Sequence, residues 1–197
     1  GTSVRLSEAD DTVTLDTRAS ASLSVDARST YAGALTIADA ASVSVSAGAN
    51  ASTGSIALDT VDTTSLTVAP GSSFTLATGN ITSTNKLATV SVSTSTTSGT
   101  ATVGTIADAD SLTSLTLTAI NANATIGQIG TDATANNAEV LTSVTVSATG
   151  TGVTATTNGI YADSVSNYAG VGAEDNIMAV SVTSGLGATA TMGLIDN

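Results

Sequence analysis

The stretch Leu112-Thr113-Ser114-Leu115-Thr116-Leu117 carries the pattern on which the predicted fold depends. Its last three residues form an apolar–hydroxyl–apolar triplet. Because successive side chains leave opposite faces of a β-strand, the two leucines point to one face and Thr116 to the other. Similar triplets recur at Leu23-Ser24-Val25, Val43-Ser44-Val45, Leu66-Thr67-Val68, Val90-Ser91-Val92, Val144-Thr145-Val146 and Val180-Ser181-Val182, with Val4-Arg5-Leu6 as a degenerate first copy.

A second triplet is expected after each first one, beyond a turn rich in Gly, Ser and Asn. Its copies are Val13-Thr14-Leu15, Leu35-Thr36-Ile37, Ile56-Ala57-Leu58, Phe74-Thr75-Leu76, Ala101-Thr102-Val103, Ala124-Thr125-Ile126, Val153-Thr154-Ala155 and Ala190-Thr191-Met192. In the later copies a further apolar residue follows, at Ile106, Ile129, Ile160 and Ile195.

The first triplets recur at spacings from 19 to 36 residues, which favours stacking each unit on the next. The sequence therefore predicts an all-β fold, a right-handed parallel β-helix (β-solenoid) of about eight coils that spans residues 1–197 as a single domain. The longer units are expected to place their extra residues in turns. A β-sandwich is the alternative, in which neighbouring strands would differ and two-residue hairpins would be common.

The repeat pattern reaches both ends of the sequence, at Val4-Arg5-Leu6 and at Ile195-Asp196. The end of a solenoid exposes unpaired N–H and C=O groups and an apolar cross-section. We therefore expect these residues to belong to a longer polypeptide or to join end to end with copies of the same chain.

Charge and composition exclude several classes of function. The net charge is −12, with 16 acidic residues against four basic ones, and there is no His or Cys. Nucleic acid is excluded as a partner, because phosphates require clustered Lys and Arg. Insertion into a membrane is not expected, because no apolar run is long enough to span one. Catalytic triads and zinc sites lose their usual ligands, so we expect no enzyme.

The repeat style and composition resemble the β-solenoid segments of bacterial surface-layer (S-layer) proteins and type I-secreted repeat adhesins. The units are rich in Ser, Thr and Ala, acidic, and almost free of Lys, His, Cys and Trp. The resemblance implies a secreted, extracellular structural protein at the cell surface, in a lattice, a matrix filament or an adhesin stalk. The calcium nonapeptide Gly-Gly-x-Gly-x-Asp of those families is missing here, so no family residue can be assigned by position.

Calcium is the cofactor that the acidic residues favour, because it requires only hard oxygen ligands. Asp59 with Asp62, and Asp108 with Asp110, are the best local pairs. Stacked coils would place Asp39, Asp132 and Asp163 along the same corner. Alternatively, these residues serve the turns themselves, since Asp bonds its own backbone there.

A row of outward hydroxyls offers a different function. Its members are Ser24, Ser44, Thr67, Ser91, Thr116, Thr145 and Ser181. Such a row could belong to an ice-binding or a carbohydrate-binding β-solenoid, with a surface polysaccharide as the ligand in the second case. The mixture of Ser with Thr and the variable coil length argue against a flat lattice that matches ice.

Overall fold

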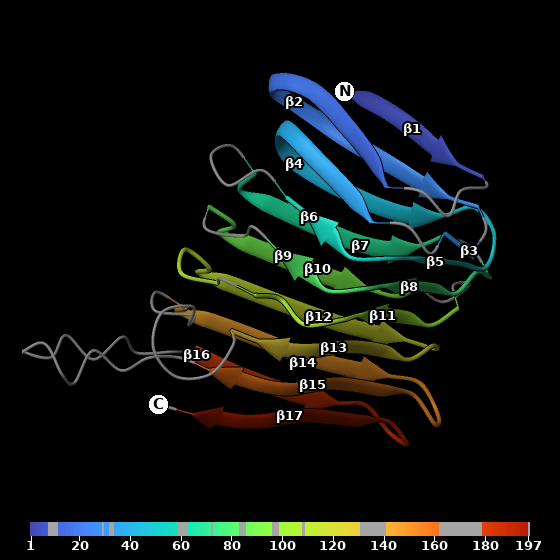
Figure 1. The fold of residues 1–197 in the computed structure, drawn as a ribbon. Helices are drawn as coiled ribbons and strands as arrows, with labels where there is room; N and C mark the ends of the chain where they lie inside the picture. The colour runs from blue at the N-terminus through green and yellow to red at the C-terminus, as the bar shows by residue number, and fades with distance from the viewer. Residues whose placement is uncertain are drawn as a thin grey trace, which may run out of the picture.

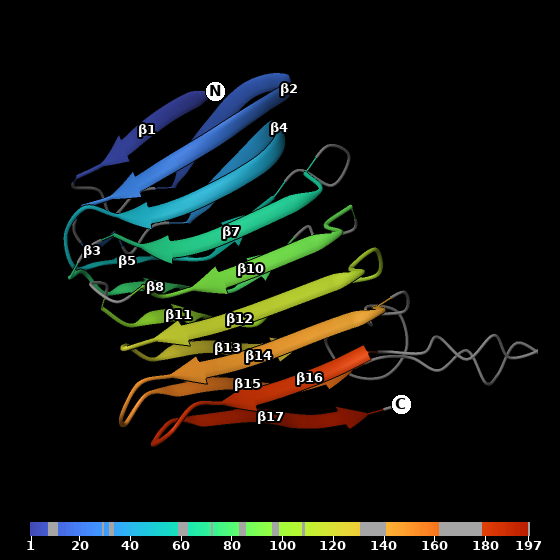
Figure 2. The ribbon, with the colours of Figure 1, turned by 180° about the vertical axis from the view of Figure 1, so that it is seen from behind.

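The computed structural model is a right-handed β-solenoid (Figures 1 and 2). It describes residues 1–7, 12–28, 30–31, 34–58, 63–71, 73–82, 86–95, 99–107, 109–130, 141–161 and 179–196. From the N-terminus to the C-terminus, the chain runs rightward through the far sheet of Figure 1 and leftward through the near sheet as it descends. Every pair among the described strands is parallel, for example β12 with β14. The alternative β-sandwich is therefore wrong.

The strands form two long sheets. The first contains β1 (Thr2–Leu6), β2 (Val13–Ala27), β4 (Leu35–Ala47), β7 (Ser65–Pro70), β10 (Thr89–Ser93), β12 (Ser114–Ile120), β14 (Ser143–Thr149) and β16 (Ala179–Ser184), joined by the short β6 (Ile56–Ala57) and β9 (Ile81–Thr82). The second contains β3 (Thr30–Tyr31), β5 (Ala51–Thr53), β8 (Leu76–Thr78), β11 (Ala101–Val103), β13 (Ala124–Ile129), β15 (Thr154–Tyr161) and β17 (Thr189–Asp196).

Each complete coil crosses three faces, which we call A, B and C. Face A contains β1, β7, β10, β12, β14, β16 and the C-terminal parts of β2 and β4, so eight strands mark eight coils. Face B contains the second sheet as far as its corner glycines. Face C contains the N-terminal parts of β2 and β4, then β6, β9 and the ends of β13, β15 and β17. A single apolar core fills the space between the faces.

Face A confirms the first triplets from the second coil to the last. Leu115 pairs with Val144 and Leu117 with Val146, and Thr116 pairs with Thr145 between them. Both valines of the seventh coil are fully buried. From the third coil on, strict alternation along the strand therefore places every apolar member next to an apolar member of the preceding coil.

The first copy is shifted by two residues from the prediction. Thr2 pairs with Leu23 and Val4 pairs with Val25, so the first triplet is Thr2-Ser3-Val4 rather than Val4-Arg5-Leu6. Thr2 stands at an inward position but is not apolar. The apolar pattern in the sequence therefore starts only at the next apolar pair, Val4 and Leu6. A shift of two keeps every side chain on its face, because the period of a strand is two.

Face C was not recognised in the sequence as a separate ladder. Its inward residues form one column along the whole solenoid: Val13, Leu35, Ile56, Ile81, Ile106, Ile129, Ile160 and Ile195. The predicted second triplets at residues 13–15, 35–37 and 56–58 belong to this column and not to face B. The later members look isolated in the sequence because face C contributes only one paired apolar residue in those coils.

Face B confirms the second triplets at residues 101–103, 124–126 and 190–192. Two other copies are wrong by two residues, because Leu76 pairs with Ala101 and Ala155 pairs with Ala124. The reason is that Thr78 and Thr157 occupy inward positions of these strands. Both threonines are buried, and neither hydroxyl has a hydrogen-bond partner among the residues that the structure describes.

The corners keep the coils at the spacing of the ladders. Gly79, Gly104 and Gly127 stack at the corner between faces B and C, where a Cβ on Gly104 would lie 2.8 Å from the carbonyl carbon of Gly79. At other points between the coils, side-chain oxygen atoms take the place of backbone acceptors. The Oδ1 atoms of Asn50, Asn80 and Asn123 accept hydrogen bonds from backbone N–H groups of the next coil, at 2.8–3.0 Å.

We predict that Val144→Asp destabilises the protein far more than Thr145→Asp. Asp at position 144 would bury an unpaired charge, which costs at least about 3 kcal/mol. Position 145 faces outward, where a substitution changes the free energy of unfolding by about 0.5 kcal/mol. Urea denaturation followed by circular dichroism measures both. Equal losses at the two positions would show that the assigned facing is wrong.

We also predict that Thr157→Val raises the free energy of unfolding by about 1 kcal/mol, since it removes a buried hydroxyl that lacks a partner and keeps the shape of the side chain. Thr157 lies in the ladder between Ile126 and Met192. Thr156→Val is the matched control, because its side chain points outward, and little change is expected. A loss of stability in Thr157→Val would mean that the hydroxyl is hydrogen-bonded in solution.

Candidate functional surfaces

Two of the predicted calcium ligands lie within the described residues, and both lie at the corner between faces C and A. Asp39 has a φ of 58°, in the left-handed region that Asp tolerates better than most residues. Asp110 is half-buried in a turn in which the N–H of Leu112 donates to the carbonyl of Ala109 at 2.9 Å. Asp110 therefore lies in a turn, whereas Asp39 lies within β4 at a position with a left-handed backbone conformation.

Asp39 and Asp110 do not form one site. Asp39 precedes the third coil on face A and Asp110 precedes the sixth, so about 14 Å separates them at ~4.8 Å per coil. The other predicted ligands, Asp59, Asp62, Asp108, Asp132 and Asp163, lie outside the described residues. Within the described ranges, no group of three or more His, Cys, Asp or Glu side chains could hold a metal ion.

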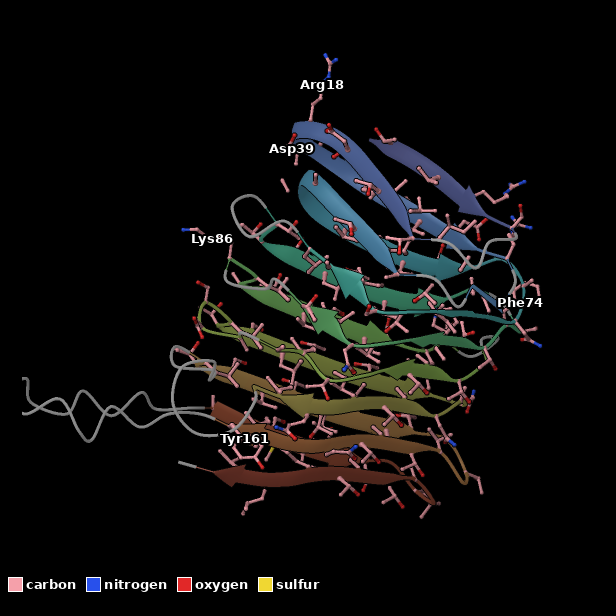
Figure 3. The ribbon with its side chains drawn as sticks, viewed as in Figure 1. Arg18, Asp39, Phe74, Lys86 and Tyr161 are labelled. Carbon is pink, nitrogen blue, oxygen red and sulfur yellow. The ribbon has the colours of Figure 1, made fainter. Side chains whose placement is uncertain are left out.

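Charged side chains gather at the corners and at the first coils. Figure 3 shows Arg18, Asp39 and Lys86 along one edge of the solenoid. On face A, Asp26 pairs with Arg28 at 2.8 Å and with Arg5 at 3.6 Å. From the third coil to the eighth, the described strands of face A have no charged side chain.

The outer side of face A is an array of hydroxyls in three parallel rows. Row 2 is the predicted one, and Ser3 extends it into the first coil. The pairing of neighbouring strands holds it in register: Ser3, Ser24, Ser44, Thr67, Ser91, Thr116, Thr145 and Ser181. Row 1 contains Ser22, Ser42, Ser65, Thr89, Ser114 and Ser143, and it ends at Ala179. Row 3 begins with Arg5 and Asp26 and contains the hydroxyl residues Ser46, Ser93, Thr118, Ser147 and Thr183, with Ala69 in the fourth coil.

The variable coil length does not disturb this array. The face A strands stay in register through the longest units, in which β12, β14 and β16 pair residue by residue. The objection that unequal coils prevent a regular surface is therefore wrong, because the extra residues fall between the end of face C and the next strand of face A. Rows 1 and 3 could have been found in the sequence from the Ser and Thr two positions on either side of row 2.

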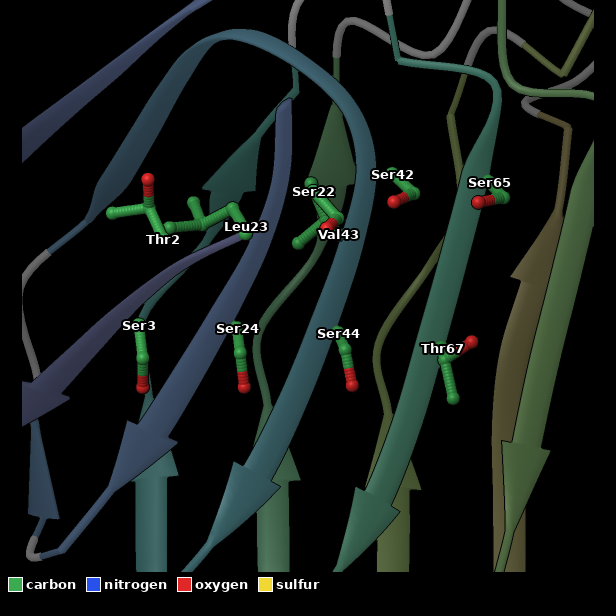
Figure 4. A pocket seen from close by; sticks show the side chains of 11 residues that line it. Thr2, Ser3, Ser22, Leu23, Ser24, Ser42, Val43, Ser44, Ser65 and Thr67 are labelled. Carbon is green, nitrogen blue, oxygen red and sulfur yellow. The ribbon is translucent and has the colours of Figure 1, made fainter. Parts of the chain in front are cut away.

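A shallow hollow of about 340 Å³ lies on this array over β1, β2, β4 and β7. Figure 4 shows Ser3, Ser24, Ser44 and Thr67 in one line, and Ser22, Ser42 and Ser65 in a second line beside it. Among the described residues, no charged or aromatic side chain lines the hollow. Its lining is Gly1, Thr2, Ser3, Ser22, Leu23, Ser24, Ser42, Val43, Ser44, Ser65 and Thr67.

The eighth coil presents an open edge. Val180 and Val182 are 41% and 43% exposed, whereas Val144 and Val146, their partners in the seventh coil, are fully buried. Leu186, at the turn after β16, is 98% exposed. The side chains on this edge are the same as in the core, and they differ only in lacking a coil on one side.

Comparison with known protein families, curated proteins and solved structures finds no match to this chain. Nor does the described part of the chain contain a helix that is long and apolar enough to cross a membrane.

Proposed function

We propose that this solenoid is a structural component of an extracellular cell-surface assembly, such as a surface layer, a matrix filament or an adhesin stalk. The observation that carries the proposal is the open edge of the eighth coil, where Val180 and Val182 are exposed at positions that are buried in the preceding coil. A surface of this kind gains hydrophobic free energy when another coil covers it.

In the proposed assembly, the covering coil belongs to another copy of the chain or is a further coil of a longer polypeptide. The free edges of β16 and β17 present backbone donors and acceptors in parallel-strand geometry, and the first coil of a copy presents β1 with the same alternation. The contact would extend a coil-to-coil interface that the molecule already contains between every pair of neighbouring coils. The lateral faces need less covering, because most of their outward positions are hydroxyl residues.

The test is sedimentation velocity at micromolar concentration. We expect the chain to form oligomers, and we expect Val182→Asp to remain monomeric because a charge on the exposed core edge cannot be buried. Ser181→Asp is the matched control, since its side chain points outward on the same strand. A monomeric parent chain whose eighth coil is protected from hydrogen exchange would overturn the assembly.

Calcium binding at the corner between faces C and A belongs to the same proposal. The net charge of −12 makes corner carboxylates repel one another, and a divalent cation between them would relieve that repulsion. The role of calcium would be to stabilise the folded coils by preferential binding.

We predict that millimolar calcium raises the melting temperature relative to a chelator, whereas magnesium has a smaller effect because it gives up its water less readily. Asp39→Asn tests the corner without disturbing its backbone, since Asn also tolerates a positive φ. The calcium effect is expected to shrink in this variant. Identical melting curves in calcium and chelator would leave the aspartates with their turn role alone.

A further inference from the structure

We propose that the hollow on face A binds a neutral polysaccharide chain, with row 2 as the line of contact. The site lies on coils one to four and the open edge lies on coil eight, so the proposal adds a ligand site to the structural role and does not depend on assembly. Its first support is the concentration of hydroxyls at one place: Ser3, Ser22, Ser24, Ser42, Ser44, Ser65 and Thr67.

The hydroxyls of the hollow are available to a ligand. Among the described residues, no protein group forms a hydrogen bond with the side chains of Ser24, Ser44 or Thr67. In row 3, by contrast, the hydroxyl of Ser46 donates to the carbonyl of Val25 at 3.3 Å. A hydroxyl both donates and accepts, as do the hydroxyls of a sugar, so the two surfaces can pair in either direction.

Charge selects the class of ligand. The protein carries a net charge of −12, and no lysine or arginine lines the hollow. An acidic polysaccharide or a phosphate would be repelled by the net charge of the molecule, and Arg5, which lies on β1 beside the hollow, is in an ion pair with Asp26 at 3.6 Å. A neutral sugar is not repelled and needs no cation.

Repetition selects a polymer over a single sugar. Ser3, Ser24, Ser44 and Thr67 come from four neighbouring strands, so their hydroxyls repeat at ~4.8 Å along the solenoid axis. That repeat is close to the length of one pyranose residue in an extended chain. Several weak contacts made by one chain add up, because each one raises the effective concentration of the next.

The shape of the surface favours a polysaccharide chain over ice. The first strands of face A are tilted steeply relative to the last ones in Figure 2, as the twist of a sheet requires, and the hollow lies among them. Ice would need a flat array, whereas a single chain fits a curved hollow. The volume of about 340 Å³ is also within the range of known ligand sites.

The test is an NMR titration of the full chain with three neutral hexasaccharides, cellohexaose, laminarihexaose and maltohexaose, at millimolar concentration, with hexagalacturonate as the acidic counterpart. We expect at least one neutral sugar to shift the amide signals of β1, β2, β4 and β7, and hexagalacturonate to shift none. Ser44→Asp is expected to weaken binding about tenfold, and Ser44→Ala by a smaller factor.

Thr116→Asp is the matched control, because it places the same charge in row 2 beyond the hollow and should retain the affinity of the parent chain. Melting curves verify that all three variants are folded. The absence of shifts with all three neutral sugars, or equal loss in Ser44→Asp and Thr116→Asp, would overturn the proposal. Inhibition of ice recrystallisation without any sugar binding would assign the array to ice instead.

Discussion

The hydrogen bonds between successive coils are the interaction on which the rest of this structure depends. They run along the solenoid axis at a fixed strand spacing, so each residue must lie directly above a residue with the same role. The core column on face C, from Val13 to Ile195, and the hydroxyl rows on face A are both results of this constraint. It also reaches the corners, where Gly104 must approach Gly79 more closely than any Cβ would permit.

The sequence shows this constraint clearly wherever both inward positions of a strand are apolar. Leu115-Thr116-Leu117 and its copies predicted face A, the facing of its side chains and the number of coils. Face B was harder to read, because inward threonines such as Thr78 and Thr157 look like surface residues. Face C was missed because a single isoleucine, such as Ile106, carries no periodicity of its own. Apolar patterning therefore detects a ladder only when the ladder is at least two apolar residues wide.

The candidate sites, too, could be predicted from the sequence only in part. The sequence identified row 2 as an outward row, because the alternation that defines the core also defines its opposite side. The Ser and Thr of rows 1 and 3 are also present in the sequence, but their alignment from coil to coil depends on where the insertions fall, which the sequence does not show. The corner aspartates illustrate the converse case. Asp39 and Asp110 occupy similar positions within their repeat units, so both lie at the same corner. Their distance depends on the number of coils between them, and three coil spacings keep them apart.

The small serine side chains of the first coils contribute to the hollow, which also includes Thr67. In the first three coils, every hydroxyl residue of rows 1 and 2 is a serine. Further along row 2, threonine stands at Thr116 and Thr145. Serine lacks the methyl group of threonine, so the serine part of the array lies closer to the backbone. Twist of the first strands adds curvature there. A lattice of identical threonines would give a flat surface with methyl groups between the hydroxyls. The serine-rich end instead exposes hydroxyls at the bottom of a depression, where a ligand can be contacted from two rows at once.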